Sequence, residues 1–148
     1  MSHFVGHPQL EQTEHRDHAG RPVYRLVQDL YYIHGAGNCI SIPAGRLTNL
    51  ATFPAGVTPL GRMFWGLVEK CLFRHLSNPN GRYIAATILH DDICSEDYPG
   101  HTRVTSQFTR YEADCLFRGA LESLGAPRWQ TLLAYWAVRI SAIAQGKE

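Results

Sequence analysis

Hydrophobic positions along the chain follow two patterns, an alternating one within residues 23–43 and a helical one after residue 60. Residues 23–33 are rich in β-branched and aromatic side chains with partial alternation, which is typical of a strand. Residues 34–38 contain two glycines and an asparagine and predict a turn, after which residues 39–43 alternate cleanly. The pattern therefore predicts one short N-terminal β-hairpin.

Beyond residue 60, apolar side chains recur with the i, i+3, i+4 spacing of amphipathic helices. Breaks at proline and glycine divide this part of the chain into four predicted helices, at residues 60–76, 82–93, 105–124 and 127–144. Thr105 or Ser106 is the predicted N-cap of the third helix, and Gly125 is its predicted stop. The predicted fold class is therefore α+β, with a short N-terminal β-hairpin followed by a bundle of about four helices.

Length and polarity predict a simple domain organisation. A chain of 148 residues has the size of one domain and can bury a sizeable core. Residues 1–21 are polar without an apolar period and predict an N-terminal arm, which leaves residues 22–148 as a single globular domain. Residues 44–61 contain three glycines and two prolines and predict a long loop, a type of segment that is often functional in small domains.

Composition and charge exclude several classes of protein. Hydrophobic residues are 45% and charged residues 18% of the chain, which excludes a disordered tail or a coiled coil. With a net charge of +1, no nucleic-acid partner is expected. The apolar stretch at residues 132–138 is far short of the ~20 residues that span a bilayer, so no transmembrane segment is expected. No secretory leader and no C-x-x-C pair is visible, so we expect reduced thiols in the cytoplasm.

The predicted second and third helices each carry an ionisable residue on an apolar face. His90 shares a helical face with Ala86 and Ile93 and so points toward the core, and Asp114 lies on a stripe with Phe117. A buried carboxylate needs a donor or a cation, and a histidine on the facing helix is a natural donor. An imidazole oriented by a buried carboxylate is the arrangement of a general base. We therefore expect His90 to be a general base that Asp114 orients.

Asp91 follows His90 directly and adds a second carboxylate to this region. Carboxylate and backbone carbonyl oxygens are ligands for hard cations, and the predicted loop can supply oxygens near Gly45 and Asn49. We expect calcium or magnesium rather than zinc as the cofactor, because the dispersed cysteines offer no thiolate cluster.

The same residues also fit other interpretations. Asp114 can pair with Arg110 one helical turn away, with His90 as a satisfied core histidine and Asp91 as a surface charge. Cys94 lies four residues after His90 and can contact it along the helix, which makes a thiolate–imidazole nucleophile a further alternative. The residue pattern leaves a catalytic dyad, a structural pair and a cysteine nucleophile open.

Three motifs, in order, resemble an uncharacterised domain family common in tailed phages and prophages. Residues 40–54 have the sequence Ile-Ser-Ile-Pro-Ala-Gly-Arg-Leu-Thr-Asn-Leu-Ala-Thr-Phe-Pro, residues 85–91 Ala-Ala-Thr-Ile-Leu-His-Asp, and residues 110–114 Arg-Tyr-Glu-Ala-Asp. The family typically has V-P-x-G-F-x-T-D-x-A-S-x-P, then A-A-x-x-H-D-x-x-Y, then R-x-x-A-D. The resemblance implies a phage or prophage protein made in the cytoplasm of a bacterial host, and it leaves association with the virion open.

The predicted helix pair is also similar to the catalytic helices of secretory and parvoviral phospholipases. In those enzymes a histidine activates water, the adjacent aspartate binds calcium, and a distant aspartate orients the histidine. The similarity implies these roles for His90, Asp91 and Asp114, in that order. It also implies hydrolysis of an ester or related acyl bond in a lipid or another acyl substrate.

Among the departures from the phage family's pattern, three affect polar or reactive side chains near the candidate site. Asn49 follows Thr48 where the family has an aspartate, which removes a carboxylate. Thr52 replaces a serine but keeps a hydroxyl, and Cys94 replaces a tyrosine that is a hydrogen-bond donor. With Arg110, the residues Thr48, Thr52 and Cys94 are expected to support the substrate or the site itself.

Two functions from different classes fit these observations. The first is a metal-assisted hydrolase of ester or acyl bonds that uses a His–Asp dyad. The second is a non-catalytic phage structural or host-interaction protein, whose partner is another phage or host protein. In the second function the same residues form a buried polar clasp between helices.

Overall fold

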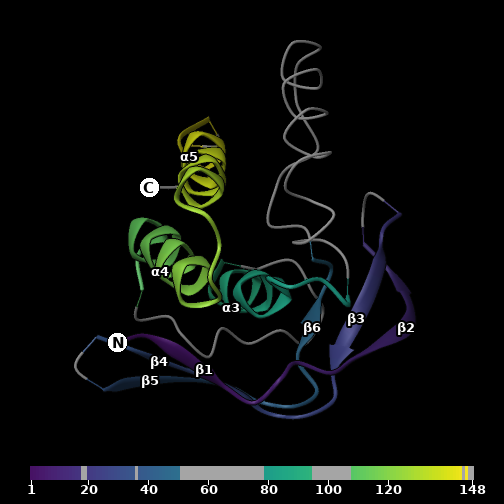
Figure 1. The fold of residues 1–148 in the computed structure, drawn as a ribbon. Helices are drawn as coiled ribbons and strands as arrows, with labels where there is room; N and C mark the ends of the chain where they lie inside the picture. Colours follow the sequence, from purple (N-terminus) through teal and green to yellow (C-terminus); the bar gives the residue numbers. More distant parts are fainter. Residues whose placement is uncertain (18–19, 36, 51–78, 95–107, 145, 147–148) are drawn as a thin grey trace.

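The computed structural model describes residues 1–17, 20–35, 37–50, 79–94, 108–144 and 146 (Figure 1). Within these ranges, six strands form two antiparallel three-stranded sheets, and three helices follow them in the chain. The first sheet has the order β1-β4-β5 and the second the order β2-β3-β6. The strands are β1 (His3–Val5), β2 (Leu10–Arg16), β3 (Pro22–Leu26), β4 (Leu30–His34), β5 (Asn38–Ile42) and β6 (Leu47–Thr48).

Strands β4 and β5 form a hairpin, paired from Leu30↔Ile42 at one end to His34↔Asn38 at the other. Gly35 and Gly37 in its turn have positive φ angles of 59° and 100°, which residues with a Cβ rarely adopt. Along both strands, alternate side chains are buried and face the core, as the alternating sequence predicts. The hairpin is present, but it is only one part of a larger β region.

The prediction of a short hairpin followed by a four-helix bundle is wrong. The single strand predicted at residues 23–33 is two strands, β3 and β4, which belong to different sheets. Between them, the Asp29 carboxylate accepts a 2.7 Å hydrogen bond from the Ala44 backbone N–H and fixes the change of direction. Partial alternation continues across this corner, so the hydrophobic pattern does not separate the two strands.

Residues 1–21, predicted as a polar arm, contain two of the six strands. β1 pairs with β4, and β2 pairs with β3, each at the edge of its sheet. Five of the seven residues of β2 are exposed, so this edge strand has almost no apolar side to produce a pattern. Backbone hydrogen bonds, which any non-proline residue can make, hold it in the sheet.

The three described helices are α3 (Ile84–Cys94), α4 (Arg110–Ser123) and α5 (Arg128–Ala144). Their predicted ranges were close, but α4 has its N-cap at Thr109, where Glu112 completes a capping box. Gly125 ends α4 as predicted, with a φ of 76° and an N–H that donates to the Glu122 carbonyl. The helix predicted at residues 60–76 lies outside the described residues. No helix in the described ranges is long and apolar enough to cross a membrane.

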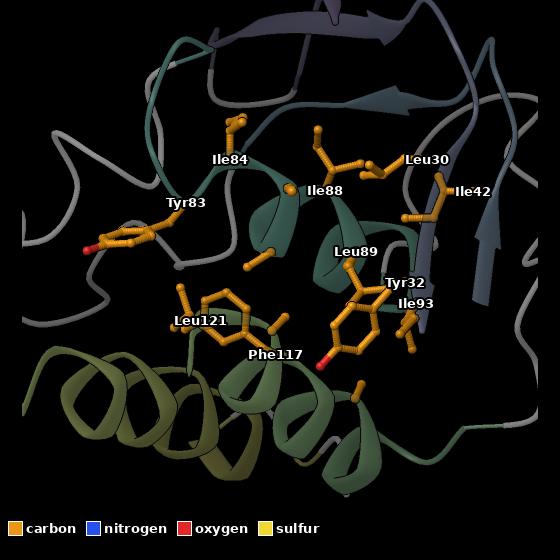
Figure 2. Close-up of a cluster of buried hydrophobic side chains, with 14 of the residues drawn as sticks. Leu30, Tyr32, Ile42, Tyr83, Ile84, Ile88, Leu89, Ile93, Phe117 and Leu121 are labelled. Carbon is orange, nitrogen blue, oxygen red and sulfur yellow. The ribbon is translucent and has the colours of Figure 1, made fainter. Parts of the chain in front are cut away.

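Helix α3 lies between the strands and α4, and α5 packs on α4 (Figure 1). All ten residues from Ile84 to Ile93 are buried, so α3 is the central element of the core. Side chains from the strands, from α3 itself and from α4 pack together in this core (Figure 2). They are Leu30, Tyr32 and Ile42 from the strands, Ile88, Leu89 and Ile93 from α3, and Phe117 and Leu121 from α4.

Candidate functional site

The polar run at the end of α3 is buried in the core. His90, Asp91 and Asp92 are only 1%, 7% and 3% exposed. Consecutive helical positions point about 100° apart, so the three side chains face different neighbours. Because a buried polar group is costly without a partner, each needs its own contact from another element. This run is therefore the place in the fold where buried ionisable groups meet.

His90 contacts Asp114 across the interface between α3 and α4. The His90 Nε2 atom lies 2.9 Å from Asp114 Oδ1, and the two side chains are 2% and 0% exposed. The Phe117 ring packs against the imidazole with a centroid separation of 4.9 Å. The predicted contact between His90 and Asp114 is thus confirmed, while the catalytic role assigned to it stays a prediction.

Two arginines complete the surroundings of the Asp114 carboxylate. Arg110 Nε lies 3.3 Å from Oδ1, and Arg139 Nη1 of α5 lies 3.4 Å from Oδ2. The alternative in which Asp114 pairs only with Arg110 is therefore wrong. Sequence reasoning missed Arg139, although a single arginine inside the apolar stretch 130–144 was a signal that it has a buried acidic partner.

Cys94 lies one turn along α3 from His90, with its Sγ atom 3.5 Å from His90 Nε2. This is the same ring nitrogen that contacts Asp114. A cysteine–histidine–aspartate relay needs the thiol and the carboxylate on opposite nitrogens, so this geometry does not support the nucleophile alternative. The other nitrogen, His90 Nδ1, is buried without a hydrogen-bond partner in the part of the chain that the structure describes.

The pKa of His90 is the result of opposing effects. Burial lowers it, whereas the neighbouring Cys94 sulfur and the hydrogen bond with Asp114 raise it, and the balance sets it at about 9. The Arg110 guanidinium acts in the lowering direction. At neutral pH these surroundings favour a protonated imidazole paired with the Asp114 carboxylate.

Asp91 and Asn49, the two predicted metal ligands, have different described partners. Thr48 Oγ1 donates a 2.6 Å hydrogen bond to Asp91 Oδ2 and accepts one of 3.1 Å from the Leu50 N–H. Asn49 Nδ2 instead donates to Asp17 Oδ2 at 2.9 Å. Among the contacts described, none joins Asn49 to Asp91, and their roles as metal ligands stay predictions.

Other predicted residues have mixed outcomes. Asp91 is not the surface charge of the structural alternative, because it is 7% exposed and bonded to Thr48 of β6. Thr52 lies outside the described residues. Sequence reasoning missed Asp92, whose Oδ1 atom lies 3.0 Å from Arg46 Nε in an ion pair. The signal was an arginine in the 40–54 motif and an aspartate in a helix with almost no polar face.

Comparison with known proteins identifies the family. The family described as "Protein of unknown function (DUF1353)" matches residues 24–138, which include every element from β4 to α4 and most of α5. Comparisons with curated proteins and with solved structures gave no match. The matched region contains His90, Cys94 and Asp114. The chain therefore belongs to the DUF1353 family, whose function is unknown.

Proposed function

We propose that this protein is a metal-assisted hydrolase of ester or related acyl bonds, with His90 as general base and Asp114 as its positioning residue. One observation carries the proposal. A buried carboxylate holds His90 Nε2 at 2.9 Å, while Nδ1 has no hydrogen-bond partner among the described residues. A histidine fixed through one nitrogen keeps the other for proton transfer.

The chemistry follows from the position of the ring proton. Above a pH of about 9 His90 is neutral, and when it then donates its Nε2 proton to Asp114 the lone pair lies on Nδ1. Nδ1 then takes a proton from a water molecule, whose oxygen attacks the acyl carbon. The same proton passes to the leaving alcohol as the acyl bond breaks, which returns His90 to its neutral form. Arg110 and Arg139 contact the Asp114 carboxylate and hold it in place throughout this cycle.

The proposed cation is calcium or magnesium, with Asp91 as its charged ligand. Support comes from the donor type, because a buried carboxylate next to His90 offers the hard oxygen that these ions prefer. The side-chain carbonyl oxygen of Asn49 is the proposed neutral ligand. The hydrogen bond from Asn49 to Asp17 is donated by the amide nitrogen Nδ2 and does not involve this oxygen. A bound cation would stabilise negative charge that develops on the acyl oxygen.

The proposed setting is a phage or prophage protein made in the cytoplasm of a bacterial host. This part rests on the three ordered motifs at residues 40–54, 85–91 and 110–114. The substrate class that the chemistry fits is a lipid or another acyl compound.

A second function, a non-catalytic phage structural or host-interaction protein, is favoured by a different observation. The side chains of His90 and Asp114 are 2% and 0% exposed, and two arginines also contact the carboxylate. Such a set of contacts can serve as a polar clasp that fixes α3, α4 and α5 relative to one another. In this case replacing His90 costs stability, about 1–3 kcal/mol, and no activity is lost.

The test is hydrolysis by the wild type and by His90→Gln at a pH above about 9, where His90 is neutral, with calcium present. The substrates are nitrophenyl esters of increasing acyl length and phosphatidylcholine vesicles, and each assay runs at a temperature where both proteins are fully folded. We expect His90→Gln to lose at least about 99% of the rate, the scale of a lost general base. His34→Gln, a histidine of β4 outside the dyad, is the matched control and should keep the rate. Absence of hydrolysis by the wild type, or an unchanged rate in His90→Gln, would leave only the polar clasp.

A further inference from the structure

Three side chains of different chemistry converge on the buried interface between α3 and α4. His90, Cys94 and Asp114 each offer one ligand atom, and the three atoms lie within 4.8 Å of one another. His90 and Cys94 are spaced i, i+4 on one helix, and Asp114 faces them from the next. A nitrogen, a sulfur and an oxygen at such a spacing are a set of protein ligands that zinc accepts.

Hydrogen bonding alone does not account for this convergence. Nε2 of His90 lies 2.9 Å from the Asp114 oxygen and 3.5 Å from the Cys94 sulfur, yet it carries at most one hydrogen. Around a tetrahedral zinc ion with bonds of about 2.0 Å to N and O and about 2.3 Å to S, the N···O and N···S separations are about 3.3 and 3.5 Å. The observed N···S separation already has this value, and the observed N···O separation is about 0.4 Å shorter.

We propose that His90, Cys94 and Asp114 form a binding site for a zinc-type divalent ion. The site is separate in chemistry from the calcium or magnesium proposed for Asp91, because it combines imidazole and thiolate ligands with a single carboxylate. Three protein ligands leave a fourth position for water. Cys94 is half-buried, whereas the other two side chains are buried, so the ion enters from the Cys94 side.

The surroundings hold the ligands in place. Arg139 contacts Oδ2 of Asp114, the oxygen that is not turned toward His90, and Phe117 packs against the imidazole. Ligating carboxylates are commonly hydrogen-bonded in this way by outer residues, which fix their orientation. A thiolate and a carboxylate together balance the 2+ charge of the ion, and Arg139 keeps its contact with the second oxygen of Asp114.

Occupation of this site has a consequence that rests on the proposed function. A neutral imidazole that binds metal through Nε2 carries its proton on Nδ1. Nδ1 then has no lone pair to accept a proton from water, so a bound ion and the general base exclude each other. Zinc therefore inhibits the proposed hydrolysis, and a chelator restores it.

The test uses cobalt(II), a spectroscopic substitute for zinc, on the full chain kept reduced with a phosphine. We expect one equivalent to produce thiolate-to-cobalt charge-transfer absorption in the near ultraviolet, which zinc removes by displacement. Cys94→Ser should lose this band and bind zinc at least about tenfold more weakly, since even outer residues of metal sites contribute that much. Cys115→Ser, at an exposed cysteine of α4, is the matched control and should keep the band.

Circular dichroism and melting curves of each variant show that it is folded before metal is added. A band that persists in Cys94→Ser, or is missing from the folded wild type, would overturn the site. These readouts need no substrate, so a failure of the hydrolysis proposal does not affect them. If the wild type is active and zinc does not change its rate of hydrolysis, the proposal that a bound ion and the general base exclude each other is wrong.

Discussion

Helices α3 and α5 break the usual distribution of polar and apolar residues in opposite directions. Helix α3 buries three ionisable side chains in sequence, at His90, Asp91 and Asp92. Helix α5 exposes a stripe of five large hydrophobic side chains, each between 47% and 58% exposed, namely Trp129, Leu132, Trp136, Ile140 and Ile143. Their spacing of three or four residues places them along one side of the helix.

The difference lies in what each helix requires from the rest of the molecule. The ionisable groups of α3 have partners on α4 and in and around β6, because their burial without partners would destabilise the fold. The apolar side chains of this stripe on α5 are largely exposed to solvent, so they contribute little to the stability of the fold. The buried ionisable side chains of α3 therefore mark the candidate site, whereas the exposed apolar side chains of α5 contribute almost nothing to the stability of the fold.

The largest expected effect on stability comes from removing the charge at the centre of the α3–α4–α5 contact. Asp114→Asn leaves His90, Arg110 and Arg139 without their shared carboxylate. We expect the free energy of unfolding to fall by about 3–5 kcal/mol, measured by urea denaturation, as for other buried pairs that lose one partner.

The control for this change lies on the same helix. Glu122 pairs with Arg118 at the same i, i+4 spacing, but its side chain is 52% exposed. Glu122→Gln should therefore cost less than about 1 kcal/mol. Equal losses in the two variants would mean that burial does not distinguish the Asp114 contacts from surface ion pairs.

The stability contributed by His90 is expected to depend on pH. Its pKa is raised from 6.5 to about 9, so the folded state binds the proton more tightly than the unfolded state. The stabilisation is fully present below the unfolded pKa and is lost as the pH rises through about 9. In chelator-treated protein, the stability difference between the wild type and His90→Gln should shrink between pH 6.5 and 9. A difference that is constant across this range would contradict the ion pair.

A smaller loss is expected at Thr48, the β6 residue that donates to Asp91 at 2.6 Å. Thr48→Val keeps the shape and removes the donor, which leaves a buried carboxylate oxygen without its hydrogen bond. Unfolding free energy should fall by about 1–3 kcal/mol. Thr13→Val in β2 removes a hydroxyl that bonds the Val23 carbonyl in a half-buried position, and it should cost less. The reverse order would mean that the contact between β2 and β3 matters more for stability than the contact between β6 and α3.

The smallest effect is expected on the apolar stripe of α5. Trp136→Ser changes an exposed side chain and should alter the unfolding free energy by no more than about 0.5 kcal/mol. Solubility should rise, because the exposed apolar area falls. A loss above about 2 kcal/mol, as for a core residue, would remove the contrast between the two helices.

The sequence predicted the helical part of the site and little of the β region. The i, i+3, i+4 spacing placed His90 and Asp114 on facing apolar sides, and their contact was found at 2.9 Å. Gly125 marked the end of α4 because a positive φ there favours glycine. Both signals are local, since they depend on residues within a turn or two of the helix.

What the sequence did not predict depends on contacts between distant segments. Edge strands β1 and β2 have little apolar pattern, and only pairing with β4 and β3 reveals them. The bond from Thr48 to Asp91 joins residues 43 positions apart, and Arg139 reaches Asp114 from α5. No local period encodes such contacts, so the pairing of charges within the core could be found only in the structure.

The position of the ring proton on His90 decides whether this histidine can act as a base directed away from Asp114. In chelator-treated protein labelled with ¹⁵N, long-range proton–nitrogen NMR spectra at alkaline pH show which nitrogen of the neutral imidazole carries hydrogen. We expect the proton on Nε2, facing Asp114, with Nδ1 unprotonated and able to act as a base. A proton on Nδ1 in the metal-free protein would contradict the proposed role of His90, because no lone pair would then be directed away from Asp114.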